Sequence, residues 1–378
     1  MSLVLFLDLG DAITKGLAVG DGRERRLRYP SVVAHRLLHS GESDSGVSLD
    51  PGEAHPRPES LKDAGHPRFR SFPGAQSFVA EAHGSDHVTE GARFTGWIAA
   101  AYGADRQTLG TGAMRDNIEA LARRALLTCG NDGPVEIVFV IDTGSKADEI
   151  LAYAEGLRGT QSIASWSFLR RARAQLTVEL RGSVMDAADC VVAAVPPEFR
   201  LDAIQRLLVI DIGYRRTKLV VVSEEGCEHV EHVDIGVSDC VKRIMRDGGG
   251  EGLYEDECAL IRALEGNRGP LEVAGRSYDV KRPLGEALRG LEEEIGNAAR
   301  KVVLNLFERR GEVCKTAAIT GGGAPLMGDN LAAQLTAGQG PMTAVWVAPD
   351  PSFLLVEGAR SIRARTPSLS PLFLGAGS

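Results

Sequence analysis

Residues 5–19 read LFLDLGDAITKGLAV, and residues 208–222 read LVIDIGYRRTKLVVV. Each stretch contains an apolar run, then Asp, any residue, Gly, three residues, Thr and Lys, and then a second apolar run. The two copies lie 203 residues apart, as the positions of Asp8 and Asp211 show. A pattern repeated in this way within one chain of 378 residues indicates an internal duplication.

Each copy predicts a β-hairpin whose turn binds a phosphate group and a metal ion. Apolar, partly β-branched runs on both sides of a Gly-containing turn are typical of two paired strands. The glycine lets the backbone approach a phosphate, and Thr and Lys add a hydroxyl and a charge. An Asp at the strand end suits Mg²⁺ held through water, because that ion keeps much of its hydration shell. Two ordinary hairpins with polar turns are the alternative.

A third glycine-rich turn lies near the C-terminus. Residues 316–320 (TAAIT) predict a strand, and a helical pattern runs from Leu326 to Leu335. Between them stand Gly321, Gly322, Gly323, Ala324 and Pro325. Such a turn can lie flat against a nucleotide and present the free N–H groups of a helix start to its phosphates. A plain loop with Pro in the first helical turn is the alternative.

These three segments resemble the phosphate-1, phosphate-2 and adenosine motifs of the actin superfamily of ATPases. The chain is most similar to prokaryotic actin-like proteins of the ParM type and to their archaeal relatives. Residues 29–34 (YPSVVA) resemble the Pro-Ser-Val-Val-like segment of that family. Residues 353–358 (FLLVEG) stand where those proteins carry Phe-Ala-Asn-x-x-Gly, and the Asn is absent here.

The resemblance implies an α/β chain with the duplicated actin-like (ribonuclease H-like) two-domain fold and a nucleotide in the interdomain cleft. Domain I is then residues 1–200, with a small outer subdomain at about 30–110, completed by a C-terminal helix within 351–378. Domain II is residues 201–350, with a small outer subdomain at about 241–311.

The resemblance also implies ATP or ADP with Mg²⁺ as ligands. Asp8 and Asp211 are expected to hold Mg²⁺ through water, and the N–H groups of both turns to bind phosphates. Arg215 and Arg216 replace smaller residues of the family, and either add charge to the site or point at a neighbouring subunit. The expected nucleotide contacts are Gly10, Asp11, Ala12, Ile13, Lys15, Gly213, Tyr214, Arg215, Thr217, Lys218, Gly321, Gly322, Gly323 and Pro325.

Glu198 is the candidate that orients the attacking water. In the family, a Gln or Glu at the end of a helix just before the second phosphate hairpin has this role. Here a helix predicted to end at Val195 is followed by Pro196, Pro197 and Glu198. The prolines stop the helix and leave the carboxylate on a turn, where it could orient water. A solvated Glu on a crossover is the equally open alternative.

Composition excludes several functional classes. The formal charge of −8 and pI near 5.6 argue against a broad basic surface that binds nucleic acid directly. Any role with DNA or other cargo would pass through an adaptor protein. Six scattered Cys without a CxxC pair predict buried thiols in a reducing compartment, without metal or disulfide use. A metal site among the six His at positions 35 to 87 is disfavoured, because suitably spaced Cys or carboxylates are missing.

The sequence also predicts a cytoplasmic protein. The run Leu3–Leu7 is too short for a signal peptide, and no apolar stretch reaches the ~20 residues that span a bilayer. The tail around residues 371–374 is expected to pack or to be disordered rather than to anchor in a membrane.

The remaining patterns predict alternating strands and helices, which imply parallel sheets flanked by helices. Residues 40–75 predict a long loop or a partly disordered insertion, and Asp247–Gly252 a flexible connection. Strands are expected at Val135–Ile141, Gln175–Leu180 and Glu228–Val233. Helices are expected at Met114–Cys129, Asp148–Leu157, Val184–Val195, Val237–Met245, Tyr254–Leu264, Pro283–Arg309 and Phe353–Arg363.

A filament-forming cytoskeletal or cytomotive ATPase is the leading functional hypothesis, with copies of itself as partner. A small-molecule kinase or phosphatase of the same fold is the enzyme alternative, although it usually needs a separate acceptor-binding Asp and a longer chain. A chaperone-like ATPase is a further alternative, but no substrate-binding domain follows. A membrane-tethered division scaffold would need an amphipathic tail.

Overall fold

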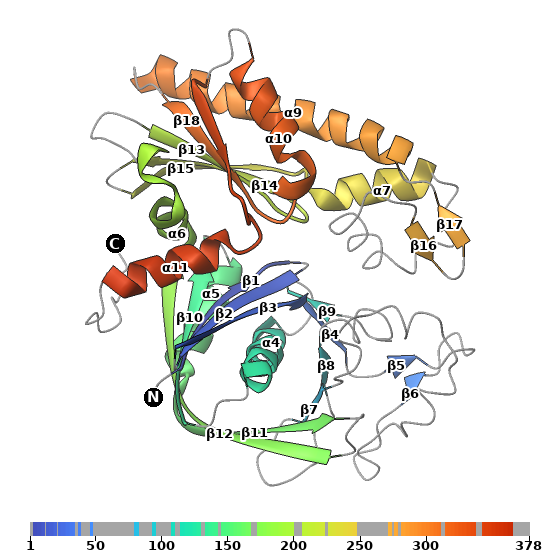
Figure 1. Ribbon diagram of the computed structural model, residues 1–378, viewed down its shortest axis with the longest axis vertical. Helices are drawn as coiled ribbons and strands as arrows, with labels where there is room; N and C mark the ends of the chain where they lie inside the picture. The colour runs from blue at the N-terminus through green and yellow to red at the C-terminus, as the bar shows by residue number, and fades with distance from the viewer. Residues whose placement is uncertain are drawn as a thin grey trace. The chain divides into compact units, whose positions relative to one another are not determined.

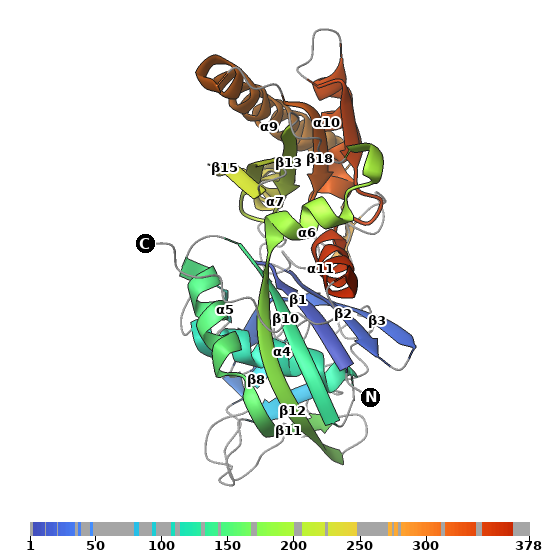
Figure 2. The same cartoon turned by 90° about the vertical axis from the view of Figure 1, so that its left-hand side faces the viewer.

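The computed structural model divides into two units. Unit 1 comprises residues 1–187 and 359–378, and unit 2 comprises residues 188–358. Figures 1 and 2 show the elements of each. The structure describes residues 3–11, 13–20, 22–34, 37–38, 46–47, 79–82, 93–95, 107–109, 114–129, 133–142, 145–167, 172–199, 206–223, 226–247, 271–273, 276–278, 281–310, 314–337 and 342–365.

Unit 1 is built on a mixed sheet in the order β3-β2-β1-β10-β12-β11-β7-β8-β4-β9. The predicted first hairpin is present, because β1 and β2 pair antiparallel with Asp8 opposite Lys15. On the other side, β1 pairs parallel with β10, and β10 with β12. The strands are β1 (Leu3–Leu9), β2 (Ile13–Gly20), β3 (Arg23–Pro30), β4 (Val32–Ala34), β7 (Val79–Ala82), β8 (Arg93–Thr95), β9 (Gln107–Thr108), β10 (Gly133–Ile141), β11 (Arg158–Ser167) and β12 (Ala172–Asp186), with β5 (Leu37–Leu38) and β6 (Gly46–Val47) paired apart from this sheet.

Helices α4 (Met114–Cys129) and α5 (Ser145–Gly156) bury the apolar side chains of unit 1. Figure 2 shows α5 beside β10 and β12, which it contacts. Leu5, Leu7 and Leu9 alternate along β1 and join one buried cluster with residues of both helices. This alternation is the period of a strand with one face on a helical layer. The layer therefore fixes which residues of β1 and β2 remain outside the cluster, Asp8 among them.

The last helix, α11 (Leu354–Arg365), is joined to the sheet of unit 1 by two ion pairs. Arg360 donates to Glu24 on β3 at 2.6 Å, and Arg363 donates to Glu136 on β10 at 2.8 Å. The Glu136 carboxylate also accepts a hydrogen bond from Ser183 on β12 at 3.3 Å. The C-terminal half of the helix thus belongs to unit 1, far in sequence from the strands it contacts.

Unit 2 repeats the hairpin plan in a mixed sheet of order β15-β14-β13-β18-β19. Strands β13 and β14 form the predicted second hairpin. The Asp of the motif, Asp211, again lies opposite its Lys, Lys218. Strand β13 pairs parallel with β18, and β18 with β19. The elements are α6 (Ala187–Ala194), the 3₁₀ turn Pro197–Phe199, β13 (Arg206–Ile212), β14 (Thr217–Ser223), β15 (Gly226–Val233), α7 (Val237–Asp247), β16 (Leu271–Val273), β17 (Arg276–Tyr278), α9 (Lys281–Arg310), β18 (Cys314–Thr320), α10 (Ala324–Thr336) and β19 (Ala344–Val347).

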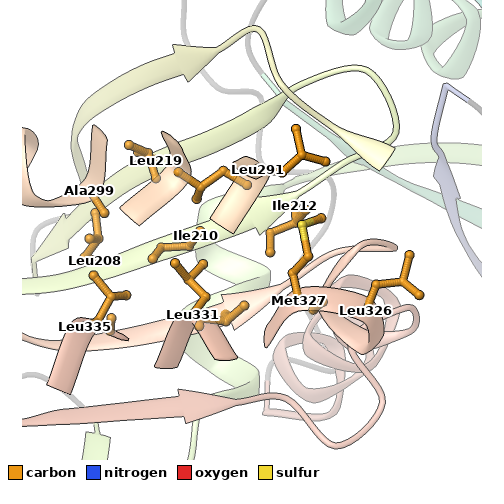
Figure 3. Packing of buried hydrophobic residues seen from close by; sticks show 14 of the residues in the cluster. Leu208, Ile210, Ile212, Leu219, Leu291, Ala299, Leu326, Met327, Leu331 and Leu335 are labelled. Atoms are coloured by element: carbon orange, nitrogen blue, oxygen red, sulfur yellow. The ribbon is translucent and has the colours of Figure 1, made fainter. Parts of the chain in front are cut away.

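Helices α9 and α10 pack side by side against one face of this sheet (Figure 1). Figure 3 shows Ile210 and Ile212 of β13 among Leu291 of α9 and Leu331 of α10, all fully buried. Burying one such side chain stabilises the fold by about 1.5–3 kcal/mol. The core therefore holds β13, whose end carries Asp211, in a fixed place within the unit.

Packing explains why residue 358, the glycine of the C-terminal segment, has no side chain. A Cβ at this position would lie 1.8 Å from the carbonyl oxygen of Cys190 in α6. No other residue allows the two helices to approach so closely.

Two expectations about secondary structure need correction, and one long strand was missed. The sheets are mixed rather than parallel, because each duplicated half contributes antiparallel strands. The helix predicted at Val184–Val195 begins only at Ala187, since Val184 and Met185 pair with β10 and extend β12. Strand β11 was not predicted: its residues (RGTQSIASWS) lack alternation, and pairing with β12 overrides that weak local preference.

The other predicted helices and strands of the described residues are confirmed to within a few residues. Outside the described residues lie most of the 40–75 insertion, the helix at Tyr254–Leu264, residues 248–252, the tail and the six His at positions 35 to 87. Among the described helices, none is long and apolar enough to cross a membrane.

Of the six Cys, five are described and all five are free. Cys190, Cys240 and Cys314 are buried as predicted, but Cys129 is only partly buried and Cys227 is exposed. Burial raises the pKa of Cys240 and of Cys314 to about 12, and that of Cys129 to about 11. These three thiols are therefore protonated and unreactive at neutral pH.

Candidate functional site

The first turn joins β1 to β2 in unit 1. Lys15 Nζ lies 3.1 Å from Asp8 Oδ2, and both side chains are mostly buried. A Cβ on Gly10 would lie 2.6 Å from the Ile13 carbonyl oxygen, so the tight turn requires glycine. Ala12 lies outside the described residues. Asp8, Gly10 and Lys15 are thus brought together as predicted, at the carboxyl end of β1.

Thr14 holds this hairpin to the chain that follows the third strand. Its hydroxyl is fully buried and lies 2.8 Å from the Ser31 hydroxyl, which is also buried. Nearby, the Tyr29 hydroxyl donates to the Leu121 carbonyl of α4 at 2.6 Å. The two polar side chains of the YPSVVA segment, Tyr29 and Ser31, are therefore used in hydrogen bonds within unit 1.

Lys146 adds a cation that the sequence reasoning missed. It lies in the first turn of α5, and its Nζ is 3.2 Å from Asp11 Oδ1. Strand β10 pairs with β1, so the loop after β10 emerges beside the first turn. The sequence did contain a signal for Lys146. A buried strand runs into the polar segment IDTGSK, and polar residues that follow neighbouring parallel strands meet at one edge of the sheet.

The second turn, in unit 2, repeats the geometry of the first. A Cβ on Gly213 would lie 2.6 Å from the Arg216 carbonyl oxygen, the same distance as in the first turn. The Gly213 N–H donates to that carbonyl at 3.0 Å. Lys218 Nζ lies 3.9 Å from Asp211 Oδ2. The duplication therefore extends from the sequence to the backbone of the turn.

The N-terminus of helix α7 is hydrogen-bonded to carbonyl groups of the second turn. The N–H groups of Val237 and Ser238 donate to the carbonyls of Gly213 and Tyr214 at 3.1 and 2.8 Å. In a trans peptide the N–H points opposite to the C=O. The N–H groups of Tyr214 and Arg215 therefore point away from α7. Two neighbouring N–H groups held in one direction favour an anion.

The Thr217 hydroxyl is directed inward. Thr217 is fully buried and donates to the Ile235 carbonyl at 2.8 Å. Ile235 follows β15 much as Ser31 follows β3. In both copies the Thr of the motif thus ties the hairpin to the segment just past its third strand.

The glycine turn of residues 321–323 packs on the second hairpin. Gly321 has φ +90°, and a Cβ there would lie 2.3 Å from Asp211 Oδ1. A Cβ on Gly323 would lie 2.4 Å from Ile212 Cγ2, whereas one on Gly322 would meet nothing within 4 Å among the described atoms. Two of the three glycines are therefore required by packing, and only Gly322 has open space for a ligand.

The start of α10 does not offer the free N–H groups that the sequence suggested. The N–H groups of Gly323, Ala324 and Leu326 donate to the carbonyls of Ile212, Gly321 and Gly323 at 2.8, 3.2 and 3.0 Å. Pro325 has no N–H and its side chain is exposed. A ligand at this turn would contact its surface rather than a helix N-terminus.

Positive charge gathers beside the second turn. Arg215 and Arg216 are exposed, and His232 pairs across the strands with Lys218. Partial burial, together with the Arg216 and Lys218 cations, lowers the pKa of His232 below its usual value. His232 is therefore neutral at pH 7, and the charge of the cluster comes from the Arg and Lys side chains.

Two carboxylates are candidates for orienting water. Glu198 is exposed on the 3₁₀ turn Pro197–Phe199 of unit 2. Asp186, which the sequence reasoning missed, ends β12 in unit 1. It pairs with Ile141, next to Val140, which pairs with Asp8. Asp186 thus lies at the same carboxyl edge as the first turn, because β12 extends further than the sequence indicated.

No protein-family model and no curated protein matches the sequence. Solved structures do match along nearly the whole chain. An archaeal actin homologue in complex with ADP is 18% identical, with 96% of this chain and 99% of that chain covered and a TM-score of 0.64. A non-polymerisable quadruple mutant of pCBH ParM is 15% identical, with coverage of 97% and 100% and a TM-score of 0.63. A ParM filament from Clostridium botulinum is 16% identical, with coverage of 95% and 99% and a TM-score of 0.61.

Proposed function

We propose that this chain, which has the duplicated two-domain fold of the prokaryotic actin-like proteins, binds Mg-ATP, hydrolyses it and assembles with copies of itself into filaments. One observation carries the proposal. Both copies of the Asp-x-Gly-x₃-Thr-Lys pattern form the same tight turn, with Asp and Lys paired beside it. Two turns that bind no ligand would not be expected to share both the backbone geometry and the Asp–Lys pair.

The residues fit a hydrated Mg²⁺. Asp8 and Asp211 offer carboxylate oxygens, the ligands that this ion prefers. Among the described residues, no group of three or more His, Cys, Asp or Glu could hold a metal ion. Mg²⁺ is often bound through only one or two carboxylates, together with water and phosphate oxygens. When bound, Mg²⁺ neutralises charge on the phosphate oxygens.

The remaining roles belong to groups of this chain. The N–H groups of Tyr214 and Arg215 bind phosphate oxygens, since α7 holds them in one direction. Lys15 and Lys218 contribute charge beside their Asp partners, and Gly322 leaves room for adenosine. Phosphoryl transfer needs positioning and charge stabilisation more than covalent chemistry, so these groups suffice for a slow ATPase.

The residue that orients water is tested by a pair of variants. Removal of the true residue is expected to slow hydrolysis by about 10²-fold while ATP affinity stays nearly unchanged, because the interaction is made chiefly in the transition state. Glu198→Ala and Asp186→Ala are compared by single-turnover phosphate release and by ATP binding. A normal rate in the Glu198 variant would return Glu198 to a solvated role, and a normal rate in both would contradict the assignment to either carboxylate.

Assembly is expected to depend on the nucleotide. ATP stabilises one conformation of a two-domain protein, and that conformation can match the surface of the next copy. Light scattering and pelleting should rise when Mg-ATP or a slowly hydrolysed analogue is added at micromolar protein. Asp8→Ala should abolish the response, whereas Asp148→Ala, at an exposed position on α5, should not.

Negative-stain images with and without ATP show whether the pelleted material is filamentous. A protein that turns over ATP yet stays monomeric across salt, crowding and concentration would contradict self-assembly. That result would favour a small-molecule kinase or phosphatase of the same fold.

A further inference from the structure

The two turns differ in charge, although their backbones are alike. The three residues between the Gly and the Thr of the motif are DAI at positions 11–13 and YRR at positions 214–216. From its first Asp to its Lys, the first copy contains two Asp and one Lys and has a formal charge of −1. The second copy contains one Asp, two Arg and one Lys and has a formal charge of +2. By itself the first turn therefore repels a phosphate group, while the second attracts it.

Lys146 supplies a positive charge to the first turn from outside the hairpin. Its Nζ lies 3.2 Å from Asp11 Oδ1, and the two side chains are 33% and 28% exposed. Lys15 pairs with Asp8 in the same turn, so each carboxylate of the turn has a lysine beside it. With Lys146 included, the formal charge of the first turn is zero.

Other carboxylates lie at the same edge of the sheet. Asp142 directly follows β10 and Asp186 ends β12, and both of these strands run parallel to β1. Loss of Lys146 would leave the Asp11 carboxylate without this partner, at an edge that already carries further negative groups. Like charges repel most strongly where water is partly excluded, so the compensation by Lys146 matters for an anionic ligand.

The position of Lys146 in its helix indicates a role outside the helix. It lies in the first turn of α5, where the partial positive charge of the helix N-terminus disfavours a cation. The Asp11 carboxylate offsets this effect, since it lies beside the Lys146 ammonium group. Helix α5 packs on β10 and β12 and contributes to the buried cluster of unit 1. The ion pair therefore connects the first turn to an element that the core holds in place.

We propose that Lys146 is a positioning residue of the nucleotide site, which holds and neutralises the Asp11 carboxylate so that the N–H groups of the first turn can receive the phosphates of ATP. Lys146 acts through Asp11 and not by contact with the phosphates. The inference rests on the proposed nucleotide binding and gives a role in it to a residue outside the duplicated motif.

A double-mutant cycle tests this role. Lys146→Ala is expected to raise the dissociation constant for ATP about tenfold, because an uncompensated carboxylate then lies in the turn that receives the phosphates. Asp11→Asn keeps the size of the side chain and removes its charge, so it should bind ATP at least as tightly as the wild type. The variant with both changes should return close to the wild-type affinity, since no carboxylate remains to be neutralised. Equilibrium binding of a slowly hydrolysed ATP analogue to dilute, unassembled protein measures all four.

Two further readouts separate charge compensation from a merely structural role. The defect of Lys146→Ala should shrink as ionic strength rises, because salt screens the repulsion between partly exposed charges. Its single-turnover rate of hydrolysis at saturating ATP should change little, since the effect is on binding. Lys146→Arg keeps the charge and should bind normally. Lys301→Ala, which removes an exposed lysine of α9, is the matched control and should not change the affinity.

The outcomes decide between the alternatives. If the double variant binds as weakly as Lys146→Ala, then Lys146 contacts the ligand directly and the role through Asp11 is wrong. If Asp11→Asn weakens binding as much as Lys146→Ala, the pair only supports the shape of the turn, and the proposal is also wrong. Normal binding by Lys146→Ala would overturn the inference and leave the proposed function intact, whereas a wild-type protein that binds no ATP would overturn the proposed function itself.

Discussion

Asp211→Ala is expected to lower the rate of ATP hydrolysis by a factor on the order of 10² or more, since it removes a carboxylate proposed to anchor Mg²⁺. Asp211 ends β13, which the core of unit 2 holds in place, and its carboxylate lies against Gly321 and near Lys218. Its loss also leaves the Lys218 charge without this neighbour. Steady-state phosphate release with saturating Mg-ATP measures the effect.

Two further variants assign the cause. Asp211→Asn keeps the shape that Gly321 packs against but removes the charge, so it should lose activity almost as fully as the Ala variant. Asp329→Ala changes an exposed carboxylate on α10 and should leave the rate unchanged. Unchanged phosphate release from a folded Asp211→Ala protein would contradict the assignment of the second turn.

Gly321→Ala is expected to destabilise unit 2 by about 3 kcal/mol or more. The backbone at φ +90° disfavours Ala by about 1–2 kcal/mol, and the added methyl would overlap Asp211 Oδ1 and the Ile212 carbonyl oxygen. At about 2–4 °C per kcal/mol, the Tm should fall by about 6–12 °C. Thermal unfolding of the protein without nucleotide measures this loss.

Gly322→Ala is the matched variant one residue further along. A Cβ there meets nothing within 4 Å among the described atoms, so the Tm without nucleotide should change by little. If adenosine lies on this glycine, the ATP dissociation constant should rise, by about tenfold for each 1.4 kcal/mol of lost contact. Equal thermal losses in both variants would contradict the packing role of Gly321. An unchanged ATP affinity in Gly322→Ala would place adenosine elsewhere.

The duplicated pattern predicted the two hairpins because the signal is local. Apolar runs on either side of a Gly-containing turn specify strand pairing within about 15 residues, and the structure pairs Asp8 with Lys15 and Asp211 with Lys218. The strand, glycine turn and helix of residues 314–336 follow for the same reason. The long helix α9 was equally readable, since its apolar residues recur at helical spacing over 30 residues.

Pairing between strands distant in sequence decided what local pattern could not. The end of β12 reads as a helix until β10 pairs with it, and only then does Asp186 come to the edge that holds Asp8. Strand β11 likewise forms because β12 offers a partner on its other side. Such pairings depend on the whole sheet, and no window of sequence contains both partners.

By itself, the sequence determined where the turns lie and which residues surround them: the Asp, Gly and Lys of each copy and the glycines at 321–323. Only the tertiary structure decided what each group does. It gives the hydroxyls of Thr14 and Thr217 buried partners, Lys146 an acidic neighbour 135 positions away, and the second turn a direction for its N–H groups. The physical reason is that a hydrogen-bonding group takes the partner that burial brings within reach, and burial is a property of the packed molecule.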